Sequence, residues 1–208
     1  MTTEDLKRLT VDDVIRLKLT EDEMARLREI NRNRERERED RVKQMQIEQA
    51  PLMRELAEAG VVYSTLGQMM NSPGPYKDAI PILLAHLEKP YSVPTRATIA
   101  RCLAVYDAIY AWPKFVELYR AEPCTERYAD GIKSDLAVAV AATTTEENIP
   151  TLIELARDRS NGSSRLHFLR KLRRSKNPLA KQALMDLATD PDLEKEIASW
   201  RRRRSSRS

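Results

Sequence analysis

Three prolines in this chain each open an apolar run, and each is followed 22 or 23 positions later by a leucine that anchors a second run. The pairs are Pro81 and Leu103, Pro113 and Leu136, and Pro150 and Leu172. The prolines lie 32 and 37 positions apart, and the leucines 33 and 36. A unit of two helices that recurs at this period is typical of a helical solenoid. The sequence therefore predicts an all-α, helical-repeat solenoid.

The second helices of the three units share a register. Ile99, Ile132 and Phe168 each lie four positions before the leucine of their unit, so each pair occupies one helical face. The apolar runs after the prolines, together with the segment Arg96-Ala-Thr-Ile-Ala-Arg-Cys-Leu-Ala, resemble HEAT repeats, particularly the short HEAT-like repeats of bacterial proteins. The resemblance covers about residues 76–175 and implies alternating A and B helices, with the B helices lining a concave surface. The second unit departs from the pattern because Gly131 and the polar residues 133–135 interrupt its B helix.

The helix boundaries follow from these patterns. We expect A helices at about 76–88, 111–121 and 148–158, B helices at about 94–107, 127–142 and 163–174, and further helices at 178–188 and 191–200. A turn is expected at Asn161-Gly162, and Gly60 is expected to end a helix in the left-handed conformation.

Three segments differ in character: a charged helical arm (1–50), the HEAT-like solenoid (51–200) and a basic tail (201–208) that we expect to be disordered. Within the arm, residues 31–41 alternate Arg and Glu and contain nothing to bury. Opposite charges fall at i,i+3 and like charges at i,i+4, so their small effects on helix stability nearly cancel. We interpret this stretch as a solvated helix rather than a coiled coil, because it offers no a or d residue.

Composition limits the cellular setting and the chemistry. Two cysteines cannot form a disulfide framework. The amino terminus lacks the apolar core of a signal peptide, and no apolar stretch is long enough to span a membrane. These features predict a cytoplasmic protein without membrane contact.

Candidate catalytic groups are few. His86 lies between leucines and fits a packing histidine, and Cys102 fits a half-buried cysteine on a packed helix. No metal-ligand spacing, phosphate-binding loop or nucleophile motif occurs, so we expect no cofactor, no metal and no enzymatic activity. Some HEAT-like solenoids are DNA glycosylases, but neither Trp112 nor Trp200 falls on a B helix, where that resemblance would need an aromatic residue.

The strongest functional signal lies on the third B helix. Its leucines and Phe168 occupy one arc, and His167, Arg170, Lys171 and Arg174 occupy the opposite arc; Arg101 has a comparable position on the first B helix. We predict that these five residues bind an anionic partner on the concave surface, although an ordinary solvated helix face is the alternative interpretation.

The function expected is a non-catalytic protein-interaction module, such as an adaptor, inhibitor or immunity-type protein. The second hypothesis is nucleic-acid binding through the third repeat and the basic tail, because the segment from Arg157 onward has a net charge of +9. Ser134 and Asp135 interrupt the basic stripe, and aromatic residues make up only 5% of the chain. Both observations favour the protein partner.

Overall fold

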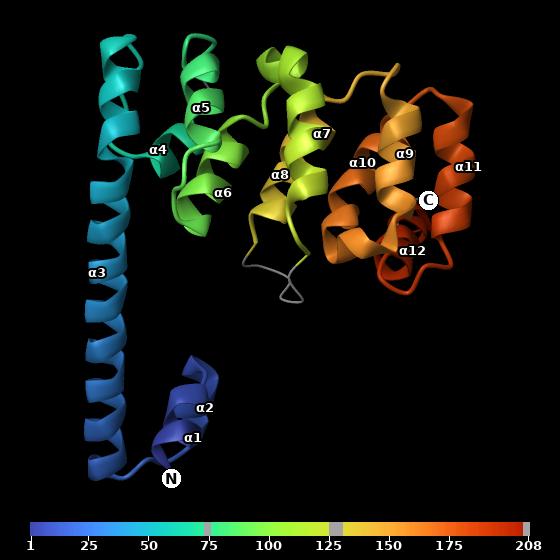
Figure 1. The fold of residues 1–208 in the computed structure, drawn as a ribbon. Helices are drawn as coiled ribbons and strands as arrows, with labels where there is room; N and C mark the ends of the chain where they lie inside the picture. Colours follow the sequence, from blue (N-terminus) through green and yellow to red (C-terminus); the bar gives the residue numbers. More distant parts are fainter. Residues whose placement is uncertain (73–75, 125–130, 206–208) are drawn as a thin grey trace. The chain divides into compact units, whose positions relative to one another are not determined.

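The computed structural model of the chain (Figure 1) describes residues 1–72, 76–124 and 131–205. These residues form helices and no strands, so the predicted all-α class is confirmed. The chain divides into two compact units, Met1–Glu48 and Gln49–Ser208.

The first unit contains α1 (Thr3–Arg8), α2 (Val11–Arg16) and most of α3 (Glu21–Glu58). Threonine side chains cap the amino termini of the two short helices: Thr2 forms a capping box with Asp5, and Thr10 forms one with Asp13. Leu6 of α1 is fully buried, and the Arg34 guanidinium donates to the Lys7 carbonyl at 2.6 Å. The two short helices therefore fold back on the first half of α3.

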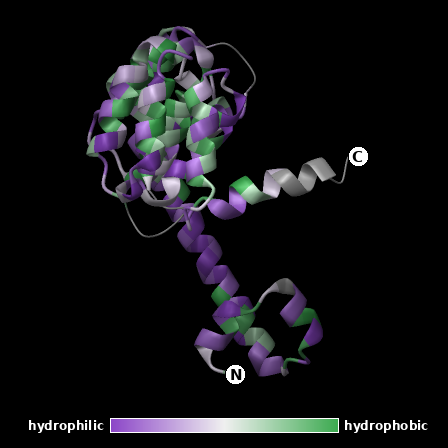
Figure 2. Ribbon diagram, turned by 90° about the vertical axis from the view of Figure 1, so that its right-hand side faces the viewer, coloured by the Kyte–Doolittle hydropathy of each residue, from purple (hydrophilic) through white to green (hydrophobic). Residues whose placement is uncertain are grey.

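The middle of α3 is helical, exposed and almost uniformly hydrophilic (Figure 2). The long charged helix predicted from the sequence is thus confirmed, and it continues through Pro51 to Glu58. A proline at this point removes one backbone donor. Gly60 follows the helix with φ of 80°, which confirms the predicted left-handed end.

The second unit continues from the last turns of α3 through a series of shorter helices. They are α4 (Leu66–Met70), α5 (Ala79–Leu87), α6 (Val93–Cys102), η1 (Tyr106–Ala111), α7 (Trp112–Ala121), α8 (Ile132–Thr143), α9 (Ile149–Arg157), η2 (Arg159–Arg165), α10 (Leu166–Arg174), α11 (Pro178–Leu187) and α12 (Glu194–Ser205). Helices α6, α8 and α10 pack against one another in that order, and each also packs against the helix before it: α5, α7 and α9 (Figure 1). Helix α4 lies against α6 at one end of this row.

The predicted register of the apolar residues is confirmed by burial. Leu103, Leu136 and Leu172 are at most 1% exposed, as are Ile99, Ile132 and Phe168. These side chains belong to one apolar core that runs from Leu52 to Ile197. Tyr119 of α7 meets Phe168 of α10 edge to face at 5.3 Å between ring centroids, so the core links helices that are far apart in sequence.

Several helix ends differ from the sequence-based expectation. Helix α6 ends at Cys102 rather than near 107, because Val105 takes an extended conformation before η1 begins. Helix α8 begins at Ile132, and residues 127–130 of the expected B helix lie outside the described residues. Gly162 has φ of 56° inside η2, which confirms the expected turn. Helix α12 includes residues 201–205 of the expected disordered tail, whereas 206–208 lie outside the described residues.

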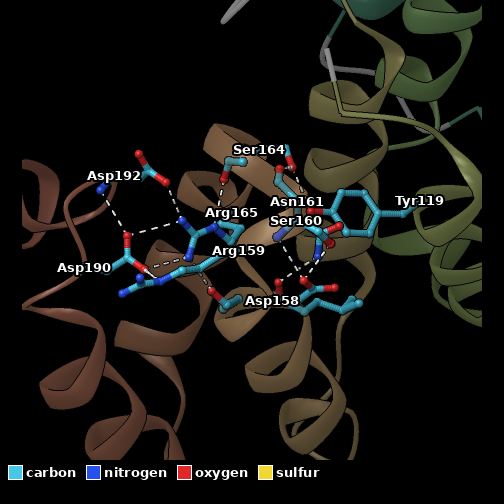
Figure 3. Close-up of polar contacts among 12 residues, drawn as sticks. Tyr119, Asp158, Arg159, Ser160, Asn161, Ser164, Arg165, Asp190 and Asp192 are labelled. Carbon is cyan, nitrogen blue, oxygen red and sulfur yellow. Dashed lines mark hydrogen bonds and ion pairs between the residues drawn. The ribbon is translucent and has the colours of Figure 1, made fainter. Parts of the chain in front are cut away.

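A buried arginine fixes the carboxyl-terminal helices (Figure 3). Arg165 is fully buried, and its five N–H donors all have acceptors within the chain. Nε donates to the Gly162 carbonyl, Nη1 to the Ala156 carbonyl and Asp190, and Nη2 to Asp190 and Asp192. One guanidinium thus connects η2 and α9 to the loop between α11 and α12.

Candidate binding surface

The sequence of α10 divides this helix into an apolar face and a basic face. Phe168, Leu169 and Leu172 are buried against the core, whereas His167, Arg170 and Arg174 are exposed and Lys171 is half-buried. Nine residues with apolar positions at spacings of three and four give a clear amphipathic helix. The core contacts of the leucines therefore turn the basic side chains outward.

All five residues predicted to bind a partner line one groove. This basic groove has a volume of about 570 Å³ and is formed by α6, α8 and α10. Its walls are Arg101 on one side and His167, Arg170, Lys171 and Arg174 on the other, with Val138, Ala141 and Ala142 between them. The structure thus brings together residues from the first and third predicted repeats.

The Arg101 guanidinium forms an ion pair with Asp135 of α8, at 2.7 Å between Nη2 and Oδ1. Asp135 was expected only to interrupt the basic stripe. Its carboxylate instead neutralises Arg101 at the edge of the groove.

The cations of α10 lack such a counterion. Across the part of the chain that the structure describes, no ion pair joins an acidic side chain to Arg170, Lys171 or Arg174. Exposed arginines on the opposite row of helices are paired: Arg120 with Glu154 at 3.8 Å, and Arg157 with Asp186 at 2.6 Å. Lys171 is nevertheless close enough to Glu146 to lower the pKa of that carboxyl. The basic groove therefore concentrates positive charge from α10 side chains that have no direct ion-pair partner.

His167 adds a titratable group to this charge. Although the residue is exposed, desolvation by the groove walls lowers the pKa of its imidazole below the ordinary value. The positive charge of Arg101 lowers this pKa further, and Asp135 opposes the decrease. A neutral imidazole is therefore favoured at neutral pH.

A second groove adjoins the first and was not predicted. This α6 groove has a volume of about 530 Å³ and shares Arg101 and Val138 with the basic groove. Its remaining lining residues are Met70, Asn71, Ser72, Tyr76, Ala97, Thr98, Ala104, Val105 and Asp135. Because these residues come from α4, α6, α8 and two loops, no single-helix pattern in the sequence indicates the groove.

The candidate catalytic residues lie inside the fold. The His86 imidazole is buried, with Nδ1 2.8 Å from the Tyr91 hydroxyl and Nε2 2.8 Å from the Glu55 carboxylate. Cys102 is fully buried, and desolvation raises the pKa of its thiol to about 12, so the reactive thiolate is disfavoured. Both residues have the environment expected of structural groups.

Two further features are absent from the described residues. They contain no group of three or more His, Cys, Asp or Glu side chains placed to hold a metal ion. They also contain no helix with the length and hydrophobicity needed to cross a membrane.

Comparison with models of known protein families, with curated proteins and with solved structures found no match for this chain.

Proposed function

We propose that this protein is a non-catalytic interaction module, of adaptor, inhibitor or immunity type, that binds another protein through the outer face of α6, α8 and α10. The observation that carries the proposal is the gathering of three α10 cations without a direct ion-pair partner at one groove. Uncompensated charge at the edge of a preformed groove is suited to recognising an acidic surface.

The fold proposed for this role is a HEAT-like solenoid. Helices α5 and α6, α7 and α8, and α9 and α10 form three successive pairs with equivalent buried residues, which supports the repeat assignment. In such an arrangement, α6, α8 and α10 are the B helices and their outer face is the concave surface. The two adjoining grooves on this face support that assignment.

Nucleic-acid binding is the second candidate function. Three cations without counterions on α10, together with the basic segment 201–208, support it. Asp135 weakens this candidate because its carboxylate lies on the same face and would repel a phosphate backbone. The protein partner is therefore the better supported of the two.

Site-specific photo-crosslinking in the native host tests the choice. A photoreactive amino acid at position 167 lies in the basic groove, and the same amino acid at position 120 provides a control on α7. We expect a protein adduct at position 167 and none at position 120, with the adduct lost in the double variant Arg170→Ala/Arg174→Ala. A nucleic-acid adduct at position 167 would support the second candidate instead.

Salt dependence separates the candidates once the crosslinked partner is purified. For a protein partner we expect Arg170→Ala to weaken binding by about 2 kcal/mol or more, because desolvated arginine contacts often dominate interfaces. The loss should persist at about 1 M salt, where the Debye length is about 3 Å. For nucleic acid, the loss per residue should be smaller and high salt should largely remove it.

A further inference from the structure

The two grooves on the outer face of α6, α8 and α10 differ in charge. Among the described residues that line the α6 groove, the charged side chains are Arg101 and Asp135, and they are paired. The basic groove contains the three unpaired cations of α10, His167 and no acidic residue. One continuous surface therefore has a neutral half and a positive half.

The neutral half also offers apolar contacts. Met70 is 38% exposed, and it lines the α6 groove together with Tyr76, Val105, Ala97 of α6, Val138 of α8 and Ala104. Where the two grooves meet, the surface is formed by Val138, with Ala141 and Ala142 beside it. Such small side chains allow the backbone of a bound segment to approach closely.

Arg101 and Asp135 form the boundary between the halves. Arg101 lines both grooves, whereas Asp135 lines only the α6 groove. A carboxylate on a bound segment is attracted to the α10 side and repelled by Asp135 on the α6 side. The pair thus restricts where negative charge can lie.

We propose, building on the proposed function, that this surface recognises a partner segment with two chemically distinct halves: a carboxylate-rich half that lies on α10 and an apolar half that lies over α4 and α6. Arg170 and Arg174 are four positions apart, so their side chains emerge about 5–6 Å apart on one helical face. Two carboxylates at the same spacing on a helical segment can each accept a bidentate pair from one guanidinium.

A chain of evenly spaced phosphates does not fit this surface as well. It would place negative charge in the neutral half, beside Asp135, and would leave the apolar side chains without contacts. The division of the surface therefore favours a protein segment over nucleic acid.

The length of the segment follows from the helix packing. The row α4, α6, α8 and α10 contains three interhelix spacings of about 8–10 Å each, or about 25–30 Å in all. A helix covers this distance with about 18 residues.

Fluorescence anisotropy with the full chain and two synthetic peptides of about 18 residues tests the proposal. One peptide has a glutamate-rich half followed by a leucine-rich half, and the other has the same composition in alternating order. We expect the two-halved peptide to bind at least about fivefold more tightly. A glutamate-rich peptide without leucines serves as a third probe.

Three variants and one control test which half of the surface binds which half of the peptide. Arg170→Ala/Arg174→Ala should weaken the affinity for the two-halved peptide by about tenfold or more. Arg120→Ala, on α7, should leave this affinity unchanged. Met70→Gln should weaken the affinity for the two-halved peptide by about threefold and leave the affinity for the glutamate-rich peptide unchanged. Asp135→Asn should tighten the glutamate-rich peptide, since it removes a repulsive charge and releases Arg101.

The outcomes separate this proposal from the proposed function. Equal affinity for the two-halved and alternating peptides, or no measurable binding of either, overturns the two-halved recognition. If the crosslinked partner still requires Arg170 and Arg174 in that case, the proposed function stands. If neither the peptides nor the crosslinked partner respond to Arg170→Ala/Arg174→Ala, both proposals fail.

Discussion

Arg165 and Asp190 form a doubly hydrogen-bonded ion pair inside the second unit, although 24 residues separate them in the sequence. Nη1 donates to Oδ2 at 3.0 Å and Nη2 donates to Oδ1 at 3.2 Å. The Arg165 guanidinium is the main reason that the pKa of Asp190 lies below its ordinary value. Arg165 is fully buried and Asp190 nearly so. Asp190 also pairs with the exposed Arg159 at 3.2 Å, so removing Arg165 would leave this buried carboxylate with one exposed counterion.

We therefore predict that Arg165→Ala destabilises the protein by about 3–5 kcal/mol. The loss combines a buried Asp190 carboxylate that keeps only its contact with Arg159 and the loss of hydrogen bonds to the Gly162 and Ala156 carbonyls. Urea unfolding followed by circular dichroism measures the change. Arg157→Ala is the matched control, since Arg157 also pairs with an aspartate but is exposed, and its unfolding curve should stay close to that of the wild type. Equal shifts for the two variants would contradict a structural role for the buried pair.

Arg165 and the core leucines differ in how far the sequence predicts their burial. Leu103 and Leu172 were assigned to the core correctly, because apolar periodicity is local and reflects burial directly. The sequence around Arg165 gave no such signal, because an arginine is normally exposed and its acidic partners occur only after two further helices, α10 and α11. Its burial depends on tertiary contacts alone.

The candidate binding surface was also predictable from the sequence only in part. The basic face of α10 could be predicted because all its residues belong to one amphipathic helix. The ion pair of Arg101 with Asp135, and the contribution of Met70 to the adjoining groove, could not be predicted because they require the packing of α4, α6 and α8. The charged half of the surface could therefore be predicted from the sequence, and the neutral half could not.

The core register gives a second prediction. Leu103→Ala and Leu172→Ala should each destabilise the protein by about 2–5 kcal/mol, because both side chains are buried among apolar neighbours. Arg38→Ala and Glu39→Ala on the exposed part of α3 should change stability by no more than about 0.5 kcal/mol. Urea melts of the four variants under identical conditions measure the difference. Comparable losses in the two groups would mean that the repeat register is wrong.

The charged stretch of α3 gives a third prediction. Residues 31–41 are helical and exposed on every side chain, so their amide hydrogens are protected only by the helix itself. We expect them to exchange much faster than those of α5, whose Leu83 and Leu87 are fully buried. Hydrogen exchange followed by mass spectrometry on the full chain measures both segments. Slow exchange in residues 31–41 would show that another chain or another part of this protein covers them.

The last prediction concerns the pH dependence of acidic-peptide binding. The pKa of His167 is lowered in the free protein, and carboxylates bound beside it would favour the charged imidazolium and raise this pKa. At pH values between the pKa of His167 in the free protein and its pKa in the complex, binding takes up a proton. Affinity for the glutamate-rich peptide should therefore increase as the pH falls through this interval, near and below about 6.5. The neighbouring groups are the guanidinium or ammonium groups of Arg101, Arg170, Lys171 and Arg174 and the carboxylate of Asp135, types that ordinarily titrate outside this range.

Anisotropy titrations between about pH 5.5 and 8 measure this effect, above the range in which the peptide carboxylates become protonated. A rise of one unit in the pKa of His167 corresponds to about a tenfold gain in affinity across the interval. His167→Gln keeps a polar side chain without a titratable imidazole, and its affinity should vary little with pH. If the wild type and His167→Gln show the same pH profile, His167 does not contact the bound carboxylates, and the acidic half of the segment must lie nearer Arg174.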